Sequence, residues 1–350
     1  MVGMRDVAKT AGVSLSTVSL VVNNTGYVSD DMRAKVEAAM RQLNYIPNEL
    51  ARNLYRNRTN TIGVIMPTIA HPFFATLTAH LQREFAARDL KTLLCSIADA
   101  DKGEGEYVDM LQRHMMDGIV MAAHTEHPGG YWTSIHRPIV AFDRTLGEGV
   151  PAVRSDHEQG GQLIARQLID SGARHVVLVG GPRSQFAEAT TFPTIRYHLT
   201  VERMLDDAGI ACDYVEAGIV ADICAHEATA RAIFERYSDV DAIVGSDLVA
   251  SVALQEALRR GISVPRDLQI IAYDGTFMAE TAGMRLTAVR QDFPAVAAAL
   301  ASRMDSQIAA DNGTTSAAAA EGGNAVAANG GQSTSEDIIS VTLIPGETTR

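Results

Sequence analysis

The chain has 350 residues, enough for two or three domains, and 46% of them are apolar, so it can bury a sizeable core. No uninterrupted apolar run reaches the roughly 18 residues of a membrane-spanning helix, and the first residues lack the apolar stretch of a signal peptide. Cys95, Cys212 and Cys224 lie far apart, which favours neither a disulfide framework nor a zinc cluster. We therefore expect a cytoplasmic protein that does not span a membrane and whose thiols stay reduced.

The net charge of −12 is unevenly distributed along the chain. Residues 1–58 hold eight Lys and Arg against five Asp and Glu, a net charge of +3, so the remainder carries −15. A basic head on an acidic body is typical of a protein in which the head alone contacts nucleic-acid phosphates. The overall negative charge therefore does not exclude DNA binding.

The N-terminal segment predicts three short helices. Apolar residues at helical spacing indicate a helix over Met4–Ala11, which Gly12 ends. Ser14 caps a second helix that reaches about Val22, and Ser29 caps a third. Two short helices joined by a glycine turn and followed by a third are typical of the helix-turn-helix.

From Ile62 onward, short β-rich runs alternate with amphipathic stretches. This alternation predicts parallel sheets with helices on both faces, and its repetition predicts two lobes, divided near residue 158 and crossing back near residue 288. Ligands bind such sheets beyond the carboxyl ends of the strands. The predicted strands are 62–66, 92–95, 118–121, 138–142, 175–179, 242–245 and 269–273, and the predicted helices are 73–88, 104–115, 158–171, 196–208, 225–236 and 248–260.

The segment 309–335 has a different composition. It is rich in Ala, Gly, Ser, Thr and Asn and has almost no large apolar side chain. Such a segment buries too little apolar surface to offset its conformational entropy, so we expect a disordered surface insertion. A final strand is predicted over Ile338–Ile344.

The sequence lacks the common catalytic and cofactor motifs. It has no GxGxxG or Walker loop and no GxSxG elbow, and the run from Gly180 to Pro182 indicates a strand-ending turn. His124 and His127 form a weak metal pair, because such histidines are more often surface residues. We therefore predict no enzyme activity, no cofactor and no metal.

Several runs occur in the order that is typical of one protein family: MRDVAKTAGVSLSTVSLVVNNTGYVSDDMRAKVEAAMRQLNYIPNELARNL, TNTIGVIMPTIAHPFF, AFDR, DHEQGG, GGP, GSDLVA, GISVPRDLQIIAYDGT and LTAVRQDF. With them the chain resembles, from about Met4 to Thr349, the lactose/galactose repressor family of bacterial transcriptional regulators. The resemblance implies an α/β protein with a helix-turn-helix head over 1–46, a hinge helix and linker over 47–58, and a two-lobed, periplasmic-binding-protein-like body with parallel sheets over 59–350. It also implies a homodimeric repressor that binds double-stranded operator DNA and senses a small molecule, with a sugar as the expected effector.

By this resemblance the second helix reads the major groove. Leu15 and Ser16 stand at the family's first two base-facing positions, where Leu15 suits a thymine methyl group. Leu20 stands where the family often has an arginine for guanine, so the base preference there differs. The implied phosphate contacts, for which helix capping is an alternative or additional role, are Ser14, Thr17, Ser19, Asn23 and Ser29.

Residues 47–54 resemble the family's hinge helix, which forms next to its twin on DNA. Leu54 matches the leucine that wedges into the minor groove. The small side chain of Ala51 allows the helix backbone to approach the DNA closely, and Asn48 is a further implied DNA contact. The alternative is an ordinary linker helix whose leucines pack on the body.

The resemblance also implies a polar effector cleft. Asp143 and Asp274 follow strands, where carboxylates accept sugar hydroxyls, and Arg196 matches a ligand-binding arginine. The run after Arg196 lacks the family's usual glycine and aromatic residue, and Ser246-Asp247 replaces the usual Asn-Asp, with Asp247 as a possible helix cap. The full implied set, for each of which packing is the alternative role, is Phe73, Phe74, Asp143, Arg196, Ser246, Asp274, Gln291 and Phe293.

Three alternatives remain at this stage. A solute-binding protein shares the two-lobed body but needs export and leaves the basic head unexplained. An α/β enzyme acting on sugars needs a catalytic constellation. The same regulator with a purine, phosphosugar or amino-acid effector differs only in the cleft, where two acidic residues favour a neutral polyol.

Overall fold

The computed structural model describes residues 2–47, 53, 58–98, 103–123, 127–186, 191–320 and 336–350, with the backbone alone for 312–320. The chain divides into two compact units, Met1–Thr59, here called the head, and Asn60–Arg350, here called the body. Among the described helices, none has the length and apolar character needed to cross a membrane.

The head contains three helices around a small core, as the sequence predicts. They are α1 (Met4–Ala11), α2 (Leu15–Asn23) and α3 (Asp30–Gln42). Gly12 ends α1 with a left-handed φ of 66°, and the Ser14 hydroxyl caps α2 by accepting from the backbone N–H of Thr17. Val7, Val18 and Val36, one from each helix, are fully buried and hold the three helices together.

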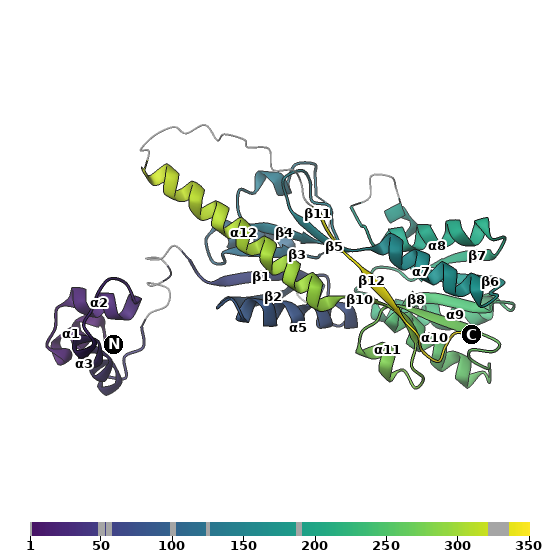
Figure 1. Ribbon diagram of the computed structural model, residues 1–350, viewed down its shortest axis with the longest axis horizontal. Helices are drawn as coiled ribbons and strands as arrows, with labels where there is room; N and C mark the ends of the chain where they lie inside the picture. The colour runs from purple at the N-terminus through teal and green to yellow at the C-terminus, as the bar shows by residue number, and fades with distance from the viewer. Residues whose placement is uncertain are drawn as a thin grey trace. The chain divides into compact units, whose positions relative to one another are not determined.

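The body contains two sheets, one in each lobe (Figure 1). In the N-terminal lobe the strand order is β11-β5-β4-β3-β1-β2, with all pairs parallel. In the C-terminal lobe it is β12-β10-β9-β8-β6-β7, parallel except where β12 pairs with β10. The strands are β1 (Thr61–Met66), β2 (Lys91–Ser96), β3 (Gly118–Met121), β4 (Ile139–Phe142), β5 (Ala152–Ser155), β6 (His175–Gly180), β7 (Ala211–Glu216), β8 (Ala242–Ser246), β9 (Gln269–Asp274), β10 (Thr287–Gln291), β11 (Glu336–Ile339) and β12 (Val341–Ile344).

Helices cover both faces of each sheet, which buries the continuous apolar strands. In the N-terminal lobe α5 and α12 cover one face of the sheet and α6 covers the other. In the C-terminal lobe α7 and α8 cover one face, and α9, α10 and α11 cover the other. Their bounds are α5 (Pro72–Ala86), α6 (Glu104–Gln112), α7 (His157–Asp170), α8 (Ile195–Asp207), α9 (Ile223–Arg236), α10 (Asp247–Arg259), α11 (Phe277–Thr281) and α12 (Phe293–Ala320), with 3₁₀ turns at Trp132–Ser134 and Arg183–Phe186.

The chain passes between the lobes three times. It crosses between β5 and α7, at residues 155–157, and returns between β10 and α12, at residues 291–293. The first crossing lies close to the predicted division at residue 158, and the second follows the predicted point by a few residues. The third, between β11 and β12, was not predicted: the expected single strand over Ile338–Ile344 is two strands, one in each sheet, with Ser340 between them.

The predicted disordered insertion over 309–335 is wrong for its first part. Helix α12 continues through Ala320, and within it Asp311 forms an ion pair with Arg137 at 2.9 Å. Alanine is the best helix former, and a helix whose earlier turns are packed on a sheet extends at little cost, so the low-complexity composition here favours a helix. Residues 321–335 lie outside the described part of the chain.

Helices α7 and α8 pack closely because α7 carries glycine where they meet. A Cβ added to Gly161 would lie 2.6 Å from the Tyr197 carbonyl oxygen and 2.7 Å from the Thr200 Cβ. We expect Gly161→Ala to lower the free energy of unfolding by about 1–3 kcal/mol. Gly105→Ala is the matched control, because that helical glycine has nothing within 4 Å of an added Cβ. Equal stability of both variants in urea denaturation would contradict the close packing.

Candidate functional site

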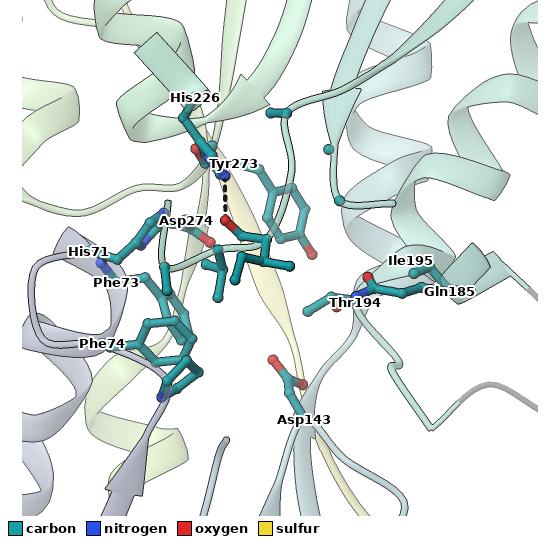
Figure 2. A pocket seen from close by; sticks show the side chains of 18 of the residues that line it. His71, Phe73, Phe74, Asp143, Gln185, Thr194, Ile195, His226, Tyr273 and Asp274 are labelled. Atoms are coloured by element: carbon teal, nitrogen blue, oxygen red, sulfur yellow. Dashed lines mark hydrogen bonds between the residues drawn. The ribbon is translucent and has the colours of Figure 1, made fainter. Parts of the chain in front are cut away.

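A cavity of about 390 Å³ lies between the lobes of the body, beyond the carboxyl ends of strands from both sheets (Figure 2). Of the residues implied by the resemblance, it is lined by Phe73, Phe74, Asp143, Ser246, Asp274 and Gln291. The structure thus brings together six side chains that are spread over more than half of the sequence.

Asp143 stands directly after β4 and is buried at the cavity wall. Its backbone has a φ of 46°, a left-handed conformation that aspartate tolerates better than most residues. Its Oδ1 lies 2.9 Å from Nε2 of His157, whose Nδ1 lies 2.7 Å from the Tyr273 hydroxyl. Since Asp143 belongs to the N-terminal lobe and Tyr273 to the C-terminal lobe, this buried chain of hydrogen bonds connects the two.

Asp274 ends β9 on the other side of the cavity, again with a positive φ, here 117°. The Gln291 amide donates to its Oδ1 at 2.8 Å and accepts from the Ser155 hydroxyl at 2.6 Å. Burial, reinforced by the nearby carboxylates of Asp247 and Asp143, raises the pKa of Asp274 well above its usual value. A protonated Asp274 donates a hydrogen bond into the cavity as well as accepting one.

The raised pKa of Asp274 predicts that this side chain costs stability at neutral pH. A carboxyl with a raised pKa in the folded state contributes stability that is present below the unfolded pKa of about 3.9 and is lost as the pH rises through the folded pKa. We expect Asp274→Asn to raise the free energy of unfolding at pH 7 by about 1–2 kcal/mol. Denaturant titrations from pH 3 to pH 8 should show this gain shrinking towards zero at acidic pH, whereas a gain that is constant with pH would contradict the explanation.

Ser246 both lines the cavity and caps α10, where its hydroxyl accepts from the Val249 N–H. Asp247, for which capping was a possible role, instead holds the turn after β9. The Asp247 carboxylate accepts from the N–H groups of Gly275 and Thr276 at 3.1 and 2.5 Å and from the Thr276 hydroxyl at 2.6 Å. The shorter serine fills the cap position, which frees the carboxylate to position the segment that follows Asp274.

The first turn of α5 supplies an aromatic wall. Phe73 and Phe74 pack edge to face, with ring centroids 5.1 Å apart, and Phe73 stacks on Phe142. Phe293 was also predicted to line the site but does not line this cavity. It is buried behind Phe73, 5.4 Å from it, because α12 begins there and turns the ring into the core of the N-terminal lobe.

Arg196 does not line the cavity either. It lies in the first turn of α8, its side chain is 45% exposed, and it donates to Glu158 on α7 at 2.6 Å. The absence of the family's usual following residues was the sequence signal for this difference. No Lys or Arg is among the described residues that line the cavity, and its acidic groups are the two carboxyls of Asp143 and Asp274.

Several lining residues were not predicted from the sequence. His71 and Tyr273 lie in runs that carry the family resemblance, whereas the others lie in helices or strands with no local signal that points to a ligand. They include three histidines and three tyrosines: His71, His198, His226, Tyr197, Tyr214 and Tyr273. Tyr197 stacks on Tyr273 with a centroid distance of 3.9 Å, which builds part of the C-terminal wall from two nearly parallel rings.

In the head, the N-terminal turn of α2 is exposed. Leu15 is 44% exposed and Ser16 is also exposed. The Ser14 hydroxyl contacts those of Ser16 and Thr17 at 2.7 and 2.8 Å. This turn presents a leucine and a group of hydroxyls on an open surface.

The other implied DNA contacts in the head are less exposed. Leu20 packs against Gly26, where an added Cβ would lie 3.2 Å from its Cδ2. Asn23 is buried and donates to Ser19 at 3.2 Å, and Ser29 caps α3. The predicted hinge contacts Asn48, Ala51 and Leu54 lie outside the described residues.

Comparison with known proteins covers both units. Residues 3–48 match the model of bacterial regulatory proteins of the lacI family, and residues 59–289 match that of the periplasmic binding proteins and sugar binding domain of the LacI family. The sucrose operon repressor of Streptococcus mutans is 32% identical over 294 residues, 84% of this chain and 89% of the repressor. The ribose operon repressor of Bacillus subtilis is 35% identical over 278 residues, 78% of this chain and 82% of the repressor.

The fold also agrees with solved structures. The lac repressor dimer bound to operator and the anti-inducer ONPF superposes with a TM-score of 0.77 at 21% identity, over 99% of this chain and 98% of that chain. The helix-turn-helix head, the two-lobed body and the matched families agree with the resemblance read from the sequence. This chain belongs to the LacI family of bacterial regulatory proteins and is a DNA-binding transcriptional regulator with an effector-binding body, not an enzyme.

Proposed function

We propose that this regulator is a cytoplasmic, homodimeric operator-binding repressor whose affinity for DNA is set by a neutral sugar bound between the two lobes. The exposed turn of α2 supports the DNA-binding part of the proposal. Leu15 and Ser16 would contact base edges there, while Ser14 and Thr17 would contact phosphates at the helix N-terminus. A dimer matches the two-fold operators that such helices read.

The chemistry of the cavity supports a sugar as the effector. Asp143 accepts hydroxyl hydrogens, Asp274 in its protonated form also donates, and Phe73 with Phe74 offers an apolar wall to a sugar face. A cavity of about 390 Å³ is within the range of small-molecule sites. Relatives named for sucrose and ribose operons agree with this class of ligand.

The single observation that carries the choice of a neutral effector is the charge of the described lining, which has two carboxyls and no Lys or Arg. A phosphate or carboxylate ligand would enter without a cationic partner and would be repelled by Asp143. Phosphosugar and amino-acid carboxylate effectors are therefore disfavoured.

Isothermal calorimetry of the full chain tests this proposal. Sucrose, D-ribose, cellobiose and lactose are titrated beside ribose 5-phosphate and sucrose 6-phosphate. We expect at least one neutral sugar to bind and its phosphorylated form to bind at least about a hundredfold more weakly, as expected for a desolvated charge without a partner. Tighter binding of a phosphorylated sugar would overturn the neutral-effector proposal.

A further inference from the structure

Two histidines from opposite lobes lie next to each other in the lining of the cavity. His71, the N-cap of α5, belongs to the N-terminal lobe and is 3% exposed. His226, on α9 of the C-terminal lobe, is 6% exposed. Their ring centroids lie 6.4 Å apart with the rings nearly perpendicular, and Figure 2 shows both beside Asp274, away from Asp143.

The hydrogen bonds of the two rings fix where each carries its proton. Nδ1 of His71 accepts the N–H of Phe73 at 3.3 Å, so in the neutral ring the hydrogen is on Nε2. Nε2 of His226 lies 3.2 Å from the carbonyl oxygen of Ile219 and therefore donates to it. His226 thus keeps the lone pair on Nδ1, a buried atom for which the described residues provide no hydrogen-bond partner.

The pair is therefore complementary. One lobe presents an imidazole N–H, and the other presents an imidazole lone pair that water does not reach. A ring nitrogen lies about 1 Å from its centroid, so nitrogens of the two rings can lie no closer than roughly 4 Å at this separation. A relative movement of the lobes that turns the two nitrogens toward each other and shortens this gap by about 1 Å brings them into hydrogen-bond range. Movements of this size are ordinary in the closure of a hinged two-lobed body.

We propose that His71 and His226 form an inter-lobe latch, in which the His71 Nε2–H donates to the His226 Nδ1 when the lobes close on the effector. The proposal rests on the proposed function, because the sugar is what brings the lobes together. The two histidines act as positioning residues: they favour the closed body without contacting the DNA. The unpartnered acceptor of the present conformation is satisfied only in the closed one, which gives closure an energetic advantage.

The latch requires both rings to be neutral. Burial and the neighbouring His226 lower the pKa of His71 to about 4. Burial also lowers the pKa of His226, although its hydrogen bond to the Ile219 carbonyl and the nearby Asp222 partly oppose this shift. Asp274 at the end of β9 and Asp143 directly after β4 are the carboxyl groups that line the cavity. At neutral pH the latch is therefore available, and it is lost at acidic pH, where protonation of His226 removes the acceptor lone pair on its Nδ1.

The test measures affinity for the sugar that binds the wild-type chain, from pH 4.5 to pH 8, by calorimetry. We expect His226→Phe, which keeps a ring of similar size, to weaken binding about three- to tenfold at pH 7, the equivalent of one buried hydrogen bond. We also expect the wild-type affinity to fall towards that of the variant as the pH is lowered. His71→Asn, which keeps a helix-capping side chain but loses the ring N–H, should show the same loss.

Two further variants separate the latch from simple packing. His226→Gln retains a donor and an acceptor and should recover part of the affinity, and His80→Gln, on α5 outside the cavity, should keep the wild-type pH profile. Equal affinity and pH dependence in wild type and His226→Phe would overturn the latch while leaving the sugar-binding proposal intact. A wild-type chain that binds no sugar at any pH would overturn the proposed function and the latch with it.

Discussion

Alanine in place of Asp143 is expected to weaken effector binding at least about a hundredfold and so to abolish the effector response, because hydrogen bonds to a carboxylate are each worth roughly 1.5–3 kcal/mol. Operator binding without effector should stay within about twofold of wild type, since the DNA-reading helix belongs to a separate compact unit. Calorimetry measures the first quantity, and a fluorescence anisotropy titration with operator DNA measures the second.

Asp143→Asn is the matched control for this result. Asparagine tolerates the left-handed φ of 46° at this position and keeps the shape of the side chain, so it separates the charge from the backbone and packing effects. We expect an intermediate loss of affinity and a thermal unfolding midpoint near that of the wild type. A normal effector response in a folded Asp143→Ala variant would remove this residue from the site.

Leu54→Ala is expected to weaken operator binding at least about tenfold while sugar affinity stays nearly unchanged, because a leucine wedged between base steps contributes to the bent complex. An electrophoretic mobility shift assay measures the operator affinity, with the operator selected by the full chain from a randomised duplex DNA pool. Calorimetry with the sugar shows whether the body is intact. The expectation comes from the sequence resemblance, in which this leucine occupies the wedge position of the hinge helix.

The control for Leu54 is Leu50→Ala, one helical turn earlier in the same segment. If both leucines merely packed on the body as an ordinary linker, the two variants would change operator affinity equally and little. A full operator affinity in Leu54→Ala would contradict the wedge, whereas a selective loss at this position would support it.

Much of the architecture could be predicted because local signals and the global fold agree. Gly12, Ser14 and Ser29 mark helix ends through their own backbone and side-chain chemistry, and the structure uses all three as predicted. The buried parallel strands are continuous apolar runs, and those were found within a few residues. Strand β7, half exposed at a sheet edge, and the short strands β5 and β10 carry weaker patterns and were missed.

The errors come from competition between tertiary context and local composition. The alanine-rich start of the 309–335 segment was expected to be disordered, but α12 is already packed on the sheet when it reaches residue 309 and continues to Ala320. Ser340 gives no local sign that the chain changes sheets. Which of Ser246 and Asp247 caps α10 depends on the turn at Gly275, a partner that only the fold brings close.

The candidate site was most predictable where a residue follows a strand. Asp143, Ser246 and Asp274 stand at the carboxyl ends of parallel strands, and the topology places those ends at the cavity. Phe73 and Phe74, on a helix, were named through the resemblance alone. His226 and Arg196 depend on which side of a helix faces the cleft, and amphipathic patterns do not distinguish a cleft from solvent. Asp143 and Asp274 both have a positive φ, so the two carboxyls of the proposed effector site stand on strained backbone.

The most direct test of the central claim is selection of binding sites by the full chain from a randomised duplex DNA pool, with and without the panel of neutral sugars. We expect a two-fold symmetric operator whose occupancy changes with one of those sugars. Failure to enrich any sequence, with the head shown to be folded, would contradict the claim that this chain is an effector-controlled operator-binding regulator.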